Sequence, residues 1–234
     1  VPNTFLKPEY AYNLDLGIDF RSLDNSNNSN YISLRGFSTI ISRHIGRANY
    51  TVFSDITTPD LSTIIYNGEE VTTISNKNLG NRFIHGFSID GFYEVYNNLK
   101  FNYSLTYTKG DDNDNYGPLP SISPLFGSLA ITYSKKDLNI KTMFKFSDAK
   151  KADEYSFGGE DGLDETPFIF ENERLIYLGT PKWSDLSVYA SKNISSDIIL
   201  RFGITNLFDT HYRTFASGIS APGRSFQIGL NFEL

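Results

Sequence analysis

The chain of 234 residues has a formal net charge of −6 and no cysteine, which excludes a disulfide framework, thiolate metal ligands and a cysteine nucleophile. The acidic balance also argues against a nucleic-acid partner, because no basic stripe is present to meet phosphates. Mean hydropathy is −0.31, and no run approaches the roughly eighteen apolar residues of a transmembrane helix. A soluble β protein and a membrane barrel remain, and the 15% aromatic content favours the barrel, which carries aromatic girdles at both interfaces.

Nine segments alternate between apolar and polar residues, which is the pattern of a strand with one apolar and one polar face. In the first of them, every second residue from Tyr12 to Phe20 is apolar, and Asp15 and Asp19 are among the residues between. The nine predicted strands cover residues 10–23, 30–42, 82–96, 99–108, 129–133, 138–148, 183–191, 198–205 and 224–234.

The second predicted strand is less regular than the first. Its alternation is interrupted at Gly36 and Phe37, which predicts a β-bulge at this point. The Asn- and Ser-rich segment 24–30 predicts the turn that joins the first two strands.

The last predicted strand reads RSFQIGLNFEL, and every second residue from Phe226 to Leu234 is apolar. A strand of a soluble protein has about five or six residues. A tilted strand that crosses a bilayer needs about nine to eleven. This segment, with eleven residues, has the membrane length.

Short and long connections alternate between the predicted strands. The links after the first, third, fifth and seventh strands are a few residues, whereas the others run to a dozen or several dozen. Short periplasmic turns on one rim and long extracellular loops on the other are typical of a transmembrane barrel. The sequence therefore predicts an all-β, transmembrane antiparallel β-barrel with a periplasmic C-terminus. Because bacterial single-chain barrels close with an even number of strands, nine strands predict an incomplete wall.

The chain resembles the C-terminal part of TonB-dependent outer-membrane receptors in three stretches, which read LKPEYAYNLDLG, GPLPSISPLFGSLAITY and NLFDTHYRTFASGISAPGRSFQIGLNFEL. The resemblance covers nearly the whole chain. It implies a 22-stranded barrel in the bacterial outer membrane that imports a scarce nutrient with energy supplied through TonB. Residues 1–234 are then expected to supply strands 14–22, while the plug and the earlier strands lie outside this chain.

The first residues, VPNTFLKPEYAYN, are most similar to the branch that takes haem from haemoglobin or a haemophore, where an Asn-Pro-Asn/Asp-Leu motif runs into Lys-Pro-Glu. Asn3 and Leu6 match this motif, and Thr4 and Phe5 depart from it. Haem is thus the implied transported ligand, with no intrinsic cofactor, and a ferric siderophore or cobalamin is the alternative. The implied partners are the part that carries the plug and remaining strands, TonB, outer-membrane lipid, and a haem-carrying protein or surface lipoprotein.

Candidate ligand-binding residues lie in the last predicted outer loop. Histidine is a usual axial ligand of haem iron and tyrosine an occasional one, so His211 and Tyr212 are the first pair to consider. Arg213 and Arg224 are candidates for an anionic group, because guanidinium pairs with carboxylates in a forked geometry. The alternatives are a solvated loop residue for His211 and packing at the barrel rim for the two arginines.

Several other polar residues are expected to have structural roles. His44 and His85 belong to this group. The segment from Asp112 to Ser123 partly matches a calcium loop, but its fifth position is Tyr116 and its twelfth is Ser123, so the bidentate glutamate is missing. No metal site is predicted.

Four cations are expected to face the lumen and to pair with carboxylates of the plug or of adjacent strands, because facing lipid would cost each about 2 to 4 kcal/mol near the midplane. They are Lys100, Lys141, Lys145 and Arg201. Aromatic residues expected at the membrane interfaces are Tyr10, Tyr12, Trp183 and Tyr189.

Catalytic motifs are not found: the sequence has no Gly-rich phosphate loop, no HExxH and no GxSxG. The protein is therefore not expected to be an enzyme. The strongest alternative of another class is a soluble β-sandwich binding module, in which the apolar faces pack against each other instead of meeting lipid.

Overall fold

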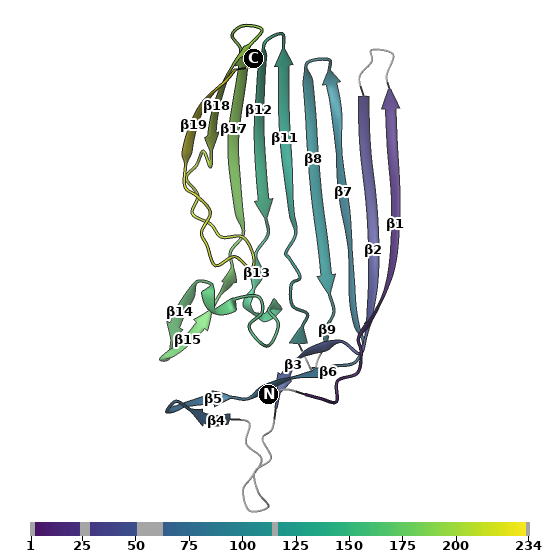
Figure 1. The fold of residues 1–234 in the computed structure, drawn as a ribbon, viewed down its shortest axis with the longest axis vertical. Coiled ribbons are helices and arrows are strands. Elements are labelled where there is room, and N and C mark those ends of the chain that lie inside the picture. Colours follow the sequence, from purple (N-terminus) through teal and green to yellow (C-terminus); the bar gives the residue numbers. More distant parts are fainter. Residues whose placement is uncertain (1–2, 24–28, 51–62, 114–116, 233–234) are drawn as a thin grey trace, which may run out of the picture.

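The computed structural model describes residues 3–23, 29–50, 63–113 and 117–232, and its main feature is one nine-stranded antiparallel sheet (Figure 1). The strands follow one another in chain order. They are β1 (Tyr10–Leu23), β2 (Ser29–Ser42), β7 (Arg82–Tyr96), β8 (Leu99–Gly110), β11 (Phe126–Lys135), β12 (Leu138–Ser147), β17 (Trp183–Asn193), β18 (Ile198–Thr205) and β19 (Ser225–Phe232). The all-β prediction and all nine predicted strands are confirmed. Residues 24–28 of the predicted first turn and 233–234 of the last predicted strand lie outside the described residues.

The predicted bulge at Gly36 and Phe37 is wrong. Both residues pair in unbroken register with the neighbouring strands, and Phe37 lies opposite Gly86. A Cβ atom on Gly86 would come within 2.7 Å of the Phe37 ring, so the glycine leaves space for an aromatic side chain on the polar face. The alternation breaks for this reason and not because of an extra residue. The register shift lies in β7 instead, between Glu94 and Tyr96.

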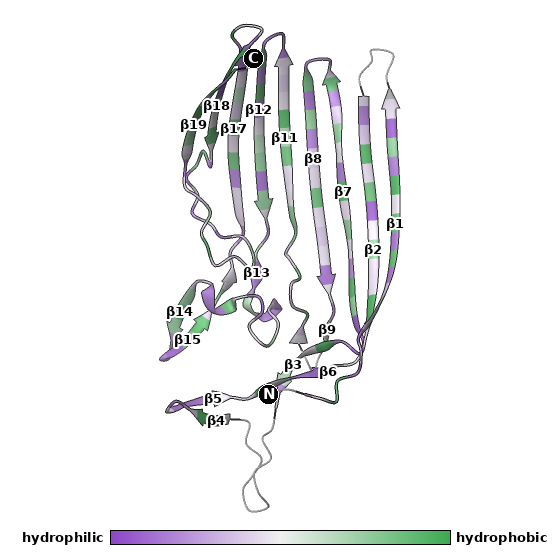
Figure 2. Cartoon of the chain, in the orientation of Figure 1, coloured by the Kyte–Doolittle hydropathy of each residue, from purple (hydrophilic) through white to green (hydrophobic). Residues whose placement is uncertain are grey.

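Apolar and polar residues alternate along the strands of the sheet (Figure 2), and the large apolar side chains of one face are exposed. Leu16 is 68% exposed and Ile228 is 78% exposed. Within the described residues no second sheet covers this face, since the other sheets are two-stranded ribbons. The soluble β-sandwich alternative is therefore wrong, and the exposed face needs an apolar medium of another kind.

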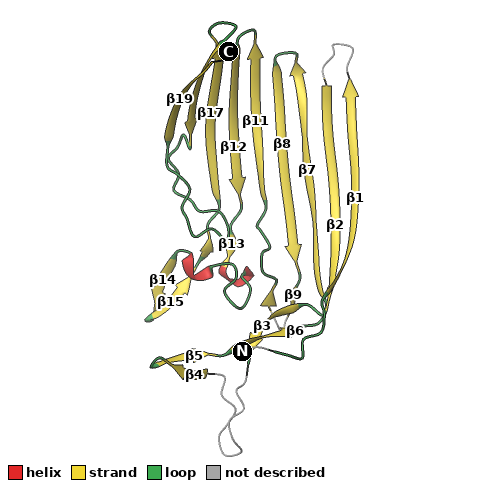
Figure 3. Ribbon diagram, in the orientation of Figure 1, coloured by secondary structure: helices red, strands yellow, loops and turns green. Residues whose placement is uncertain are grey.

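Among the residues that the structure describes, helical structure is limited to two short 3-10 turns, Ala152–Glu154 and Leu163–Glu165 (Figure 3). In the described part of the chain, no helix is long and apolar enough to cross a membrane.

The two ends of the sheet differ in their connections (Figure 1). The C-terminus lies at the end with short turns, such as Asn97–Asn98 between β7 and β8. At the other end, called the loop end below, the long connections form two-stranded ribbons. They are β3 (Ile45–Asn49) with β6 (Ile74–Asn78), β4 (Thr63–Tyr66) with β5 (Glu69–Thr72), β9 (Asp112–Asn113) with β10 (Gly117–Pro118), β13 (Lys150–Lys151) with β16 (Gly179–Thr180), and β14 (Phe168–Glu171) with β15 (Arg174–Tyr177).

Most of the buried residues belong to the loop end and not to the middle of the sheet. Arg82, where β7 begins, is 1% exposed. Its Nε donates to Asp111 Oδ1 at 3.0 Å, and its Nη2 donates to the carbonyls of Asp111 and Gly117 at 2.9 and 2.7 Å. This guanidinium fastens the connection after β8 to the start of β7. The loop end therefore has an interior of its own.

The polar face carries the predicted cations. Lys100 Nζ lies 3.8 Å from Glu94 Oε1 and 3.4 Å from the centre of the Phe92 ring, which confirms the expected pairing with an adjacent strand. The described residues place no carboxylate within 4 Å of the three other cations, Lys141, Lys145 and Arg201, so their pairing with a plug stays a prediction.

Exchanging Leu16 for lysine should destabilise the complete barrel by about 2 to 4 kcal/mol, because this mid-strand position is on the apolar face. The matched control is Asp15→Lys, one residue away on the opposite face, which should cost less than about 1 kcal/mol. Unfolding by urea in lipid vesicles measures both free energies. Equal losses for the two variants would contradict the assignment of the faces.

Candidate functional site

The last long loop, residues 206–223, is closed at its base by one side chain. Asn206 is 2% exposed, and its Nδ2 donates to the carbonyls of Thr210 and Pro222 at 2.9 and 3.1 Å. Its Oδ1 accepts from the Thr210 amide at 2.9 Å. The backbone of Asn206 is left-handed, with φ of 49°, a conformation that asparagine tolerates. This residue turns the chain out of β18 and joins both ends of the loop.

Tyr212 in this loop is held against β17. Its ring stacks on Trp183, with centroids 4.3 Å apart and 16° between the planes. Its hydroxyl donates to Asp185 Oδ2 at 3.2 Å, and Ser187 Oγ donates to the other Asp185 oxygen at 2.7 Å. Burial raises the pKa of the Tyr212 phenol, and the neighbouring Asp185 carboxylate raises it further. Trp183 thus supports this loop, and its expected place at the membrane interface stays a prediction.

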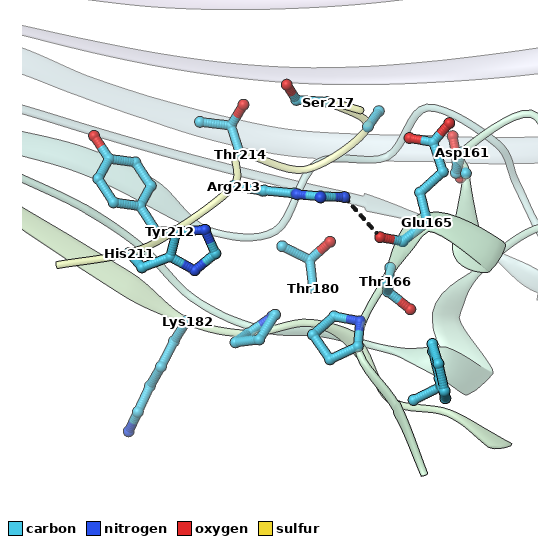
Figure 4. A pocket seen from close by; sticks show the side chains of 15 residues that line it. Asp161, Glu165, Thr166, Thr180, Lys182, His211, Tyr212, Arg213, Thr214 and Ser217 are labelled. Atoms are coloured by element: carbon cyan, nitrogen blue, oxygen red, sulfur yellow. Dashed lines mark hydrogen bonds between the residues drawn. The ribbon is translucent and has the colours of Figure 1, made fainter. Parts of the chain in front are cut away.

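A cavity of about 450 Å³ lies beside Tyr212, between segments 161–168, 180–182 and 211–217 (Figure 4). The structure brings His211, Tyr212 and Arg213 together in its wall. Arg224, the fourth predicted ligand-binding residue, does not line this cavity. Its backbone amide donates to Asp209 Oδ1 at 2.7 Å and the residue is exposed, so the role of its side chain stays a prediction.

The three lining residues differ in how freely they can meet a ligand. His211 is exposed, and its Nε2 lies 3.0 Å from Ser220 Oγ. Arg213 donates from Nε to the same Ser220 oxygen at 3.3 Å and from Nη1 to the Glu165 carbonyl at 2.9 Å. Arg213 therefore ties segment 161–168 to the last loop and spans the cavity (Figure 4). The roles of these residues in ligand binding stay predictions.

A buried lysine lies beside the cavity. Lys150 is 4% exposed, and its Nζ donates to the Ile122 carbonyl. The ammonium lies 4.5 Å from the centre of the Phe215 ring and 5.6 Å from that of Tyr155, so two aromatic faces shield it. Burial lowers the pKa of Lys150, although Asp161 and Glu154 act in the opposite direction. This cluster joins three long connections.

The cavity contains charges of both signs. Asp161 and Glu165 are acidic, whereas Lys182 and Arg213 are basic. Such a site can bind an organic compound that has both hydrogen-bond donors and acceptors.

Among the described residues, no three His, Asp or Glu side chains lie close enough together to hold a metal ion. The segment expected not to be a calcium loop lies partly outside the described residues, because 114–116 are not described.

The sequence reasoning missed the acidic side of the cavity. Asp161 and Glu165 lie in the segment 149–182, which is rich in Gly, Asp and Glu and has no alternation. The sequence contains one signal for defined turns in this segment, which is the group of glycines Gly158, Gly159 and Gly162. In the structure all three have positive φ angles.

Asn206→Gly should loosen the last loop selectively, since glycine keeps the left-handed conformation but removes three hydrogen bonds. We expect the local free energy of opening to fall by about 2 kcal/mol. Hydrogen exchange of the amides in 207–223 measures it. The control is Asn172→Gly in the exposed turn between β14 and β15, where asparagine also has a φ of 49°, and equal acceleration of exchange in both variants would argue against the anchoring role.

The stability of the Lys150 cluster should rise with pH. The pKa of Lys150 is lower in the folded loops than its ordinary value of 10.5. Between the lowered pKa and 10.5, opening of the cluster takes up a proton, so opening becomes less favourable as the pH increases. Hydrogen exchange of 149–182, corrected for intrinsic rates, should show this trend as the pH approaches 10.5 from below. Lys150→Met should lack the trend, and Lys151→Met should keep it. A trend that survives in Lys150→Met would assign it to another group.

Comparisons with known proteins agree with this architecture. The family model described as "TonB dependent receptor-like, beta-barrel" matches residues 1–207. A search of curated proteins gives no match. Similar solved structures include the copper transporter OprC, with a TM-score of 0.65 and 17% identity, covering 98% of this chain and 33% of that one.

Two further solved structures are receptors. A variant of the ferric enterobactin receptor PfeA from Pseudomonas aeruginosa has a TM-score of 0.64 and 17% identity, covering 97% of this chain and 31% of that one. The siderophore receptor PirA from Acinetobacter baumannii has a TM-score of 0.65 and 20% identity, covering 97% and 32%. At these identities the likeness concerns the fold, and this chain spans about a third of the length of each structure. With the nine-stranded sheet and the family match over residues 1–207, the chain belongs to the TonB-dependent receptor-like β-barrel family.

Proposed function

We propose that this chain forms strands 14–22 of a 22-stranded outer-membrane receptor that imports a scarce nutrient, and that the plug and the other strands belong to the rest of that receptor. The nine-stranded sheet with an exposed apolar face carries this proposal. Within the described residues β1 and β19 each pair on one side only. An unpaired strand edge in lipid leaves backbone groups unsatisfied at several kcal/mol each by order of magnitude, so both edges need neighbouring strands.

The loop end faces the cell exterior in this proposal, and the C-terminus faces the periplasm. Two features support this orientation. Short turns are typical of the periplasmic rim of bacterial barrels. The cavity beside Tyr212 lies among the long connections, where an incoming compound would arrive first. Release into the periplasm then draws on energy delivered through TonB to the plug.

The imported compound is proposed to be a metal bound to an organic chelator, with a ferric siderophore as the first candidate. Two similar solved structures are receptors for ferric enterobactin or a siderophore, and a third is a copper transporter. The cavity of about 450 Å³ is in the range of small-molecule sites, and its charges of both signs suit a chelator with polar arms.

Haem is the second candidate, supported by His211, which is exposed and lines the cavity. Tyr212 does not strengthen this candidate. Its hydroxyl already donates to Asp185 Oδ2 at 3.2 Å, and its ring is stacked on Trp183. A haem-carrying protein or a surface lipoprotein would be a partner only in the haem case.

Deletion of the complete receptor from its bacterium should abolish uptake of one compound among ferric siderophores, copper complexes, cobalamin and haem. Deletion of TonB should abolish the same uptake. Accumulation of isotope-labelled iron, copper or cobalt under metal limitation measures the effect.

His211→Ala should lower the uptake of haem if haem is the imported compound. It should leave siderophore uptake within about twofold of normal, since one rim histidine adds little to the binding of a chelator held by many polar contacts.

The uptake proposal has clear contrary outcomes. Unchanged uptake of every compound after deletion of the receptor would contradict it. Uptake that needs the receptor but not TonB would point to a passive channel instead. Asp164→Asn, an exposed change near the cavity, is a suitable control because it should leave uptake intact.

A further inference from the structure

Asp161 is a buried carboxylate with one unsatisfied oxygen. The residue is 3% exposed, and Oδ1 accepts a hydrogen bond from the Ser121 amide at 2.8 Å. Its Oδ2 has no hydrogen-bond partner in the described part of the chain. A buried acceptor without a donor destabilises the fold, and a charged one does so more strongly. An unsatisfied buried acceptor of this kind needs an explanation, and the residue that carries it lines the cavity.

Asp161 is one of two carboxylates that line the cavity. Asp161 and Glu165 both line the cavity, and Figure 4 shows them on the same side of it, away from His211. Two residues of the last loop, Arg213 and Gly218, lie against Glu165. Its carbonyl accepts from Arg213, and its Oε2 lies 2.8 Å from where a Cβ of Gly218 would be, so a larger residue at 218 would displace it. Two carboxylates therefore form one acidic side of the cavity.

The buried cation Lys150 interacts electrostatically with Asp161 but does not hydrogen-bond to it. Lys150 Nζ is used by the Ile122 carbonyl and the two aromatic rings. Arg213 has its Nε on Ser220 and its Nη1 on the Glu165 carbonyl. No described cation lies within 4 Å of an Asp161 oxygen. The group that completes the site must therefore donate a hydrogen bond, and a positive charge suits two adjacent carboxylates.

We propose that Asp161 and Glu165 bind a protonated primary amine of the imported compound, with Asp161 Oδ2 accepting one of its N–H groups. As a statement about the imported compound, this rests on the proposed function and narrows its chemistry to chelators with a free amine. Glu165, on the same side, contributes the second negative charge.

The test uses the purified complete receptor in detergent and three small probes with the same four-carbon chain. Butylammonium carries charge and N–H donors, butyltrimethylammonium carries charge alone, and 1-butanol is a neutral donor. Saturation-transfer NMR titrations should give the tightest binding for butylammonium, with about tenfold weaker binding for the other two. This comparison needs no variant, so it holds even if a substitution disturbs the loops.

Two variants then locate the amine. Asp161→Asn keeps the shape and an oxygen for the Ser121 amide, and it should weaken butylammonium binding about tenfold. Glu165→Gln should weaken it less, because its carboxylate is more exposed. Asp164→Asn is the matched control, and it should leave binding unchanged. Hydrogen exchange of the Ser121 amide checks that the Asp161→Asn loop stays folded.

Equal binding of butylammonium and butanol, absence of butylammonium binding, or unchanged binding in Asp161→Asn would each overturn the amine site. None of these measurements involves TonB or transport. Loss of the proposed import function with intact amine binding would thus remove the function alone. Normal TonB-dependent uptake without amine binding would remove the site alone.

Discussion

A strand in lipid must hydrogen-bond all of its backbone groups to neighbouring strands and present apolar side chains to the hydrocarbon. The rest of this structure depends on that constraint. It explains why Leu16 and Ile228 are exposed and why their neighbours on the other face are polar. It also explains why the interior lies among the loops, since a single sheet with lipid on one side has no second layer to pack against.

The sequence predicted the nine strands because a strand with one apolar face has a period of two, and this signal is local. Connection lengths, also local, predicted which end carries the loops. The bulge expected at Phe37 was wrong because the side chain fits over Gly86, which is 49 residues away and visible only once the strands are paired. The last predicted strand is confirmed over Ser225–Phe232.

The site was predictable only in part. His211, Tyr212 and Arg213 were found because they are chemically conspicuous residues in one loop, and they do line one cavity. The opposite wall was missed because Asp161 is positioned by a contact with Ser121, 40 residues earlier, and no local pattern encodes it. Arg224 illustrates the converse, since it is close in sequence to the others but does not line the cavity.

The long connections are fastened mainly by side chains that bond to backbone atoms. Asn206 joins Thr210 to Pro222, and Asn78 Nδ2 donates to the carbonyls of Lys7 and Arg43 at 2.9 and 2.8 Å. Backbone acceptors are the same whatever residue carries them. The neighbouring positions can therefore change in size and charge while the loops keep their paths, so the surface of the loop end can diverge in sequence while its fold is retained.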